Sequence, residues 1–129
     1  MKLDISRDRY INDSVTTASP ARLITMMYDR LVLDLTTAEA SLTSESPREA
    51  CAALTHAQDI VIELRASLRT DTWSGASGLA SLYAFLISEL IAANVNKDRD
   101  RVVSCRELVE PLRDAWHEAA NLYGQRRSA

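Results

Sequence analysis

Apolar residues recur at three- and four-residue spacing through four long segments of this chain, and glycine and proline hardly interrupt them. Only three Gly and three Pro occur among 129 residues. Clusters of β-branched or aromatic residues bounded by turns, which would predict strands, do not occur in the sequence. An all-α fold is therefore expected, and the length suits one domain with a single core.

The first two helices each have a Ser-Pro pair at their start. Serine can accept a hydrogen bond from a free backbone N–H, and proline at the first helical position lacks only an N–H that would have no partner. Ser19-Pro20 starts a helix expected over residues 20–42. Ser46-Pro47 starts a second helix that ends near Leu68, and Glu49 is placed to complete a capping box. The expected core stripes are Ile24, Met27, Tyr28, Leu31, Leu35, Ala38 and Leu42, then Ala50, Ala53, Leu54, Ala57, Ile60, Val61, Leu64 and Leu68.

The third helix is expected over residues 79–94, and it is apolar nearly all round, which is typical of a helix that is central or covered by a partner. Asp98 is placed to cap a fourth helix that ends near Gly124. A kink is expected at Pro111, because the apolar stripe keeps its phase across it. The expected core positions are Leu79, Leu82, Tyr83, Leu86, Ile87, Leu90, Ile91, Ala93, Val102, Cys105, Leu108, Val109, Leu112, Trp116, Ala119 and Tyr123.

Short connections between the four segments predict antiparallel neighbours in an up-and-down four-helix bundle over residues 19–124. Residues 1–18 are expected as a flexible N-terminal cap segment, and residues 125–129 as a C-terminal tail. The N-terminal segment carries the apolar residues Tyr10, Ile11 and Val15. It is either a frayed end or a cap that lies in a surface groove of the bundle.

Composition argues against several classes of partner. The formal charge is −3 and arginines lie scattered between carboxylates, so a nucleic-acid partner is not expected. The start, MKLDISRDRY, lacks the apolar core of a signal peptide, and Glu89 and Asn94 interrupt the longest apolar run. A cytoplasmic protein without membrane insertion is therefore predicted. Cys51 and Cys105 have no partner at metal or redox spacing and are expected as reduced thiols.

Residues for catalysis or cofactor binding are missing from the expected inner stripes. A di-metal bundle needs glutamates and Glu-x-x-His pairs that project inward, but the chain has only two histidines. Asp114 precedes His117 by three residues, whereas Ala53 holds that place before His56. No acidic residue is expected on an inner stripe, and neither cysteine has a histidine at helical spacing. No metal, cofactor or enzymatic activity is therefore expected.

Four apolar residues are expected on the outside of the bundle. By helical phase, Met26 and Leu33 face outward on the first helix, and Ile62 faces outward on the second. Phe85 lies on the narrow polar side of the third helix. Each alone is more often ordinary surface, but together on a small bundle they favour a groove that binds a partner.

Four stretches of the sequence, in order and at similar spacing, resemble the FliS family of cytoplasmic chaperones that hold flagellin before export. They cover most of the chain, from about Tyr10 to Ala119. Three positions depart from the family pattern: Arg30, Ala84 and Pro111. The stretches are SVTTASP with Leu23 and MMYD (26–29), AQDIVIELRASL (57–68), LYAFLISELIAANVNKD (82–98) and LRDAWHEA (112–119).

This resemblance implies an antiparallel bundle without catalytic activity that binds the disordered C-terminal segment of flagellin along apolar grooves. It also implies delivery to the flagellar type III export apparatus, possible docking at the export gate, and a possible homodimer when unliganded. The N-terminal segment would cover part of the groove when no flagellin is present. The candidates for flagellin binding or capping are Tyr10, Ile11, Val15, Met26, Leu33, Ile62, Leu82, Tyr83 and Phe85.

The residues themselves leave a second interpretation open, in which the chain is a helical adaptor or regulator that binds another partner through the same grooves. The two differ in whether the partner's binding region is disordered when free. Ordering a disordered tail should give a large negative heat-capacity change and coupled helix formation.

Overall fold

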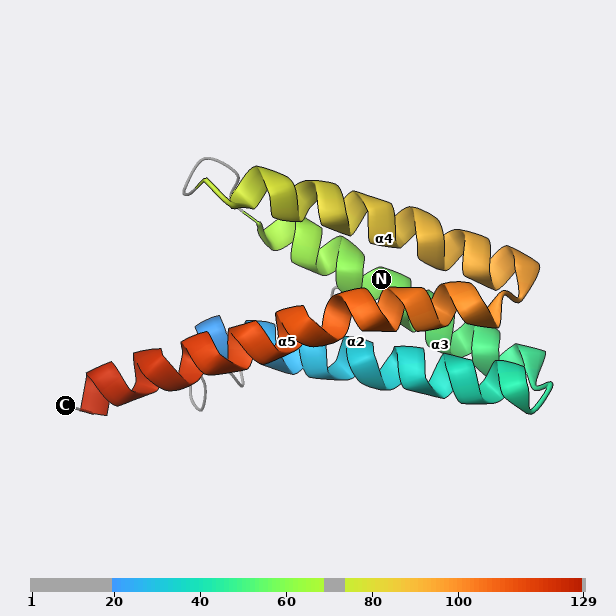
Figure 1. Cartoon of the computed structure of the whole chain (residues 1–129), viewed down its shortest axis with the longest axis horizontal. Helices are drawn as coiled ribbons and strands as arrows, with labels where there is room; N and C mark the ends of the chain where they lie inside the picture. Colours follow the sequence, from blue (N-terminus) through green and yellow to red (C-terminus); the bar gives the residue numbers. More distant parts are fainter. Residues whose placement is uncertain (1–19, 69–73, 129) are drawn as a thin grey trace.

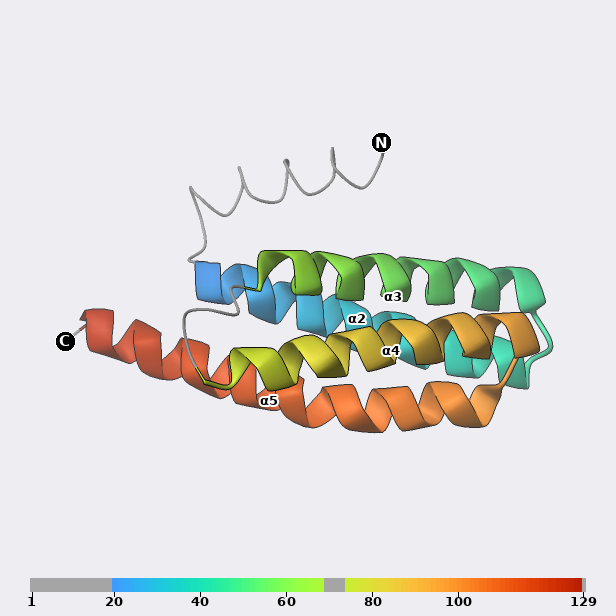
Figure 2. The same cartoon turned by 90° about the horizontal axis from the view of Figure 1, so that it is seen from above.

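The computed structural model describes residues 20–68 and 74–128, with side chains up to Leu122. Consecutive helices run antiparallel, and each packs beside the next, with the last returning to the first (Figures 1 and 2). The predicted all-α, up-and-down four-helix bundle is therefore confirmed. The helices are α2 (Pro20–Thr43), α3 (Pro47–Ser67), α4 (Ala76–Asn96) and α5 (Arg99–Ser128).

Two helices are longer than the sequence pattern predicts. Helix α4 begins at Ala76 rather than Leu79, because Ala76 is itself fully buried and extends the packed face by a turn. Helix α5 continues through Pro111 and past Gly124 to Ser128. A single glycine inside a helix costs only about 1 kcal/mol relative to alanine, so Gly124 is not a sufficient stop signal. The residues expected as a tail thus continue α5 as far as Ser128.

Two tight turns join the helices at one end of the bundle, and each contains a non-glycine residue in the left-handed region. Glu45 has φ 57° between α2 and α3, and Lys97 has φ 51° between α4 and α5. The Asp98 N–H donates to the Ala93 carbonyl at 3.0 Å, which closes the end of α4. The Asp98 carboxylate accepts from the Arg101 N–H at 3.1 Å, so the predicted cap of α5 is confirmed.

The capping box predicted at α3 does not form. Ser46 occupies the N-cap position, but its side chain makes no capping hydrogen bond. Its backbone N–H instead donates to the Ser41 carbonyl at 2.8 Å. Because the tight turn already uses this N–H, the Glu49 carboxylate has no donor to reach back to, and the prediction was wrong.

The core is built from the predicted stripes of all four helices. At its centre the hydroxyls of Tyr28 and Tyr83 lie 2.6 Å apart, which links α2 to the diagonally opposite α4. The Trp116 ring on α5 lies against Tyr28 with centroids 6.3 Å apart, although Trp116 is only partly buried. Fully buried large side chains include Leu31, Leu35, Leu54, Val61, Leu64, Leu86, Leu90, Val102 and Val109.

One acidic side chain lies inside the bundle, against expectation. Asp34 on α2 is buried, and its carboxylate contacts Arg30 one turn earlier at 3.3 Å. The same carboxylate contacts Nδ1 of His56 across the interface with α3. These two partners provide hydrogen bonds that a buried carboxylate requires, which explains why the position tolerates aspartate.

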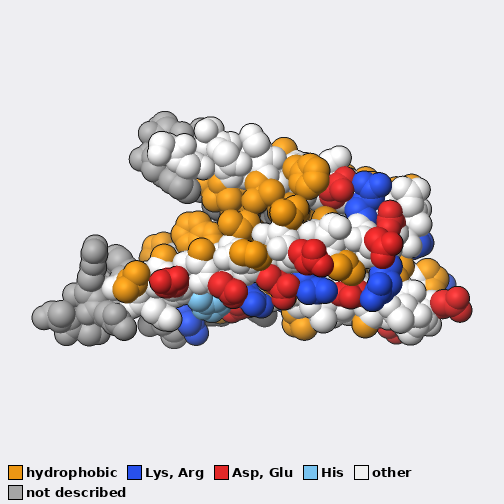
Figure 3. Space-filling model, in the orientation of Figure 1, with side chains coloured by type: hydrophobic (Ala, Val, Ile, Leu, Met, Phe, Trp, Pro, Cys, Tyr) orange, Lys and Arg blue, Asp and Glu red, His pale blue; other side chains and the backbone are white. Residues whose placement is uncertain are grey.

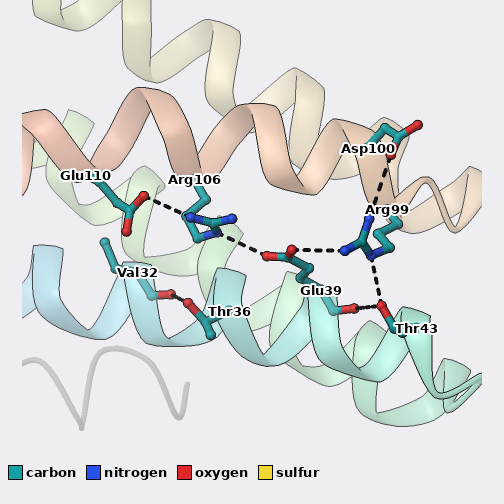
Figure 4. A network of polar contacts seen from close by, with 8 residues as sticks. All are labelled: Val32, Thr36, Glu39, Thr43, Arg99, Asp100, Arg106 and Glu110. Carbon is teal, nitrogen blue, oxygen red and sulfur yellow. Dashed lines mark hydrogen bonds and ion pairs between the residues drawn. The ribbon is translucent and has the colours of Figure 1, made fainter.

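Charged side chains close the seam between α2 and α5 (Figure 4). Glu39 on α2 accepts from Arg99 at 3.2 Å and from Arg106 at 3.1 Å. Arg106 also donates to Glu110 at 2.9 Å, and Arg99 donates to the Thr43 hydroxyl at 2.8 Å. These contacts fix the first half of α5 against α2.

Helix α4 is long and apolar enough, by length and composition alone, to cross a membrane. The sequence led us to expect no membrane insertion, because Glu89 and Asn94 interrupt the apolar run, but the observed helix is long and apolar enough despite them. In the structure α4 packs mainly on α3, and its Glu89 pairs with Arg101 of α5. Much of its apolar surface is exposed, which makes α4 the unusual element of the bundle.

Candidate functional site

Helices α4 and α5 diverge from the Lys97 turn that joins them, so that the first half of α4 stands away from the second half of α5 (Figure 1). Figure 3 shows a hollow between these two helices, lined on both sides with hydrophobic side chains. The α2–α3, α3–α4 and α2–α5 pairs are all more closely packed. We call this hollow the α4–α5 groove.

The walls of the groove can be placed from an ion pair that joins its two helices. Arg101 Nη1 on α5 lies 2.8 Å from Glu89 Oε2 on α4. The faces of α4 and α5 that carry these two residues therefore face each other. On α4, Phe85 and Leu82 precede Glu89 by one and two turns on the same side. On α5, Leu108 and Leu112 follow Arg101 by two and three turns. These four residues begin the apolar walls, and the α5 wall continues along the same side of that helix to Leu122.

Several wall residues are exposed although they are large and apolar. Phe85 is 50% exposed, Leu108 is 43% exposed, and Leu122, further along the same side of α5, is 55% exposed. Leu82, Leu112 and Trp116 are partly buried against the core. A row of apolar side chains from two facing helices with this exposure is typical of a surface that binds another chain.

Two buried tyrosines lie beneath the groove. The Tyr28 hydroxyl contacts the Tyr83 hydroxyl, and the Trp116 side chain lies against Tyr28. Burial raises the pKa of both phenols above the ordinary value, so both stay neutral at physiological pH. The pair offers hydrogen bonding within the core rather than acid–base chemistry at the surface.

The structure separates the residues predicted as a binding site. Leu82 and Phe85 lie on the groove side of α4, whereas Tyr83 is buried in the core. Ile62 is exposed on α3. Met26 and the exposed Leu33 lie on the outer face of α2, the helix diagonally opposite α4. Tyr10, Ile11 and Val15 lie outside the described residues.

Sequence reasoning missed the α5 wall. Leu108 and Leu112 were expected in the core, because they continue the apolar stripe of that helix. The stripe extends to one side, through Ala115, Ala119 and Leu122, at three- and four-residue spacing. The apolar stripe of α5 is wider than one facing helix can cover, and this width is the signal that could have predicted the wall.

The two cysteines differ in their surroundings. Cys51 on α3 is exposed, and hydrogen bonds from Asn94 and then Thr55 lower the pKa of its thiol. Cys105 on α5 is buried, and burial raises the pKa of its thiol to about 11. Among the described side chains, no three His, Cys, Asp or Glu residues gather in a way that could hold a metal ion.

Comparisons with known proteins show which family this chain belongs to. The family model described as "Flagellar protein FliS" matches residues 4–123. The chain belongs to the FliS family. It is 27% identical over 110 residues to the flagellar secretion chaperone FliS of Bacillus subtilis (strain 168), covering 85% of this chain and 82% of that one. It is 26% identical over 111 residues to the protein of the same name from Escherichia coli (strain K12), covering 84% and 82%.

A solved structure shares the fold. The crystal structure of a flagellar chaperone from bacteria superposes with a TM-score of 0.72 at 18% sequence identity. The match covers 88% of this chain and 94% of that one. The resemblance to flagellar secretion chaperones that the sequence predicted is confirmed, and the bundle is the FliS fold.

Proposed function

We propose that this FliS-family chain is a cytoplasmic export chaperone that binds the disordered C-terminal segment of flagellin in the α4–α5 groove. It would keep flagellin from polymerising prematurely and deliver it to the flagellar type III export apparatus. The observation that carries the proposal is the groove itself, which exposes Phe85 and Leu108 on facing helices of an otherwise well-packed bundle. No step in this function requires catalysis or a cofactor.

The shape of the groove suits a chain that is unfolded when free. Ordering a disordered segment costs about 2 to 5 kcal/mol, so an extended contact is needed to offset it. The α5 wall runs from Leu108 to Leu122, a length of about four helical turns. Apolar contact along such a wall can supply the required free energy at about 25 cal/mol per Å² of buried apolar surface.

A subunit held in this way cannot use the same apolar residues to pair with other subunits. The proposal therefore predicts one-to-one binding and suppression of polymerisation by the same contact. The test is calorimetric titration with a flagellin C-terminal segment, together with light scattering of full-length flagellin under polymerising conditions. One-to-one binding with a large negative heat-capacity change, and loss of scattering, supports the chaperone function. Absence of binding to any flagellin segment contradicts it.

We further propose that residues 1–18 cover the groove when no flagellin is bound, with Tyr10, Ile11 and Val15 as the contacting side chains. Deletion of residues 1–17 should then increase binding of a dye that reports exposed apolar surface, while the helical content stays the same. The deleted form should bind flagellin at least as tightly, because it no longer has a competing segment. Unchanged dye binding would contradict the capping role.

Outward residues on other helices could extend the contact. Met26 and Leu33 on α2 and Ile62 on α3 remain candidates for a flagellin segment that continues around the bundle. Glutamate substitutions at Leu33 and Ile62, measured in the same titration, test each surface separately. A loss of affinity at either position would show that the bound chain leaves the α4–α5 groove.

A further inference from the structure

The α4–α5 groove has a charged group at the end where its two helices meet. Figure 3 shows acidic and basic side chains between the helices at that end, next to the apolar lining. The group consists of Glu89 on α4, Asp98 in the turn and Arg101 on α5. We call it the charged end of the groove.

This group has more negative than positive charge. The Arg101 guanidinium lies 2.8 Å from Glu89 and 3.4 Å from Asp98, so one cation faces two carboxylates. The neighbouring Lys97 ammonium is directed away from this group, because it donates to Asn94 at 2.9 Å on the α3 side of α4. Outside this group, the almost fully exposed Asp100 is paired with Arg99 at 3.9 Å, so these two charges offset each other.

The buried thiol of Cys105 is affected by the same charges. Burial is the largest cause that raises the pKa of the Cys105 thiol, and the charge of Glu89 raises it further. Arg101 lowers the pKa of that thiol by less than Glu89 raises it. Glu89 therefore acts on this buried thiol more strongly than Arg101 does.

Glu89 also has capacity for another partner. Arg101 contacts its Oε2 atom, and among the described residues no donor is recorded for its Oε1 atom. The side chain is about a quarter exposed, so a ligand in the groove can reach it. Both carboxylate oxygens of Asp98, by contrast, already accept hydrogen bonds from Arg101, one from its backbone N–H and one from its guanidinium.

We propose that the charged end recognises a lysine or arginine of the bound segment, placed directly beside the apolar stretch that lies against Phe85 and Leu108. Glu89 is the residue that binds this basic side chain. Arg101 is a positioning residue: it holds the Glu89 carboxylate in place, and its positive charge weakens the attraction between Glu89 and the basic side chain. The contact sets the register of the segment along the groove. This inference rests on the proposed function and names a feature of its substrate.

Two variants of one ion pair separate charge recognition from a structural role. Glu89→Gln and Arg101→Gln both remove the salt bridge between α4 and α5, and Arg101→Gln also removes the contact with Asp98, so it should destabilise the bundle somewhat more. Their effects on binding should have opposite signs. At about 50 mM NaCl, Glu89→Gln should weaken binding of a flagellin C-terminal segment about threefold, and Arg101→Gln should strengthen it about threefold. Glu49→Gln on α3, which removes an exposed carboxylate away from the groove, is the matched control and should bind like the wild type.

The measurement is calorimetric titration of the four proteins at low salt and again at about 300 mM NaCl, where screening should shrink both differences. Replacing the basic residue of the segment by glutamine should then cost affinity against the wild type and little against Glu89→Gln. Weakening in both variants, no change in either, or inverted signs overturns the recognition of a basic residue while leaving the chaperone function intact. If the wild type binds no flagellin segment, the proposed function fails and this inference fails with it.

Discussion

The buried hydroxyl pair beneath the groove allows a worked prediction for stability. Tyr83→Phe removes one hydrogen bond but leaves the Tyr28 hydroxyl with its contact to the Trp116 side chain. The expected loss is about 1 kcal/mol, the typical net value of one hydrogen bond. Tyr28→Phe removes the partner of both Tyr83 and Trp116. Leaving a buried hydroxyl without a partner raises the expected loss to about 2 to 3 kcal/mol.

The double variant tests whether the two hydroxyls act on each other. With both removed, no tyrosine hydroxyl is left without a partner, so the combined loss should be about 1 kcal/mol smaller than the sum of the single losses. Urea unfolding followed by circular dichroism measures all four proteins, and both substitutions keep the ring, so no large cavity complicates the comparison. Additive losses, or a larger loss for Tyr83→Phe than for Tyr28→Phe, would refute this account of the hydrogen bonds.

Three further predictions concern the turn and the thiols. Lys97→Gly should raise the free energy of unfolding by about 1 kcal/mol, because glycine adopts the left-handed conformation at φ 51° without strain; unfolding in urea checks this, and a loss would contradict it. A thiol reagent at pH 7 should modify Cys51 quickly and Cys105 only on unfolding, and Asn94→Ala should slow the Cys51 reaction; equal rates for both cysteines would refute the assignment. The raised pKa of Cys105 favours the neutral thiol in the folded state, so its contribution to stability is complete below about pH 8.5 and is lost as pH rises toward 11. Cys105→Ala should therefore unfold with a weaker dependence on pH in that range, and an unchanged slope would contradict the burial effect.

Helical phase was enough to predict the bundle because burial in a helix repeats with a fixed period. Leu31, Leu54 and Leu90 are buried as expected, whereas Ile91, which was also expected in the core, is 47% exposed. The Asp98 cap was also predictable, since its donor is local in sequence. Local chemistry failed at Ser46, where the tight turn competes for the same N–H.

The groove could not be predicted in this way, because it depends on the angle between two helices. Leu108 lies on the same stripe as Val109 and Leu112, and periodicity gives no reason to treat it differently. Only the divergence of α4 from α5 leaves it exposed. Asp34 was missed for a related reason, because its partner His56 comes from a neighbouring helix and is distant in sequence.

The central claim, that flagellin binds in the α4–α5 groove, is tested most directly by comparing Leu108→Glu with Val95→Glu. Both place a carboxylate at an exposed apolar position, 43% exposed at Leu108 and 76% exposed at Val95. Val95 lies outside the groove, next to Asn94, which contacts Cys51 of α3.

Each variant is first shown to be folded by circular dichroism and urea unfolding, and is then titrated with a flagellin C-terminal segment in the calorimeter. The account predicts that Leu108→Glu weakens binding about tenfold or more, equivalent to about 1.4 kcal/mol, while Val95→Glu binds like the wild type. Wild-type affinity in Leu108→Glu, or an equal loss in both variants, would contradict it.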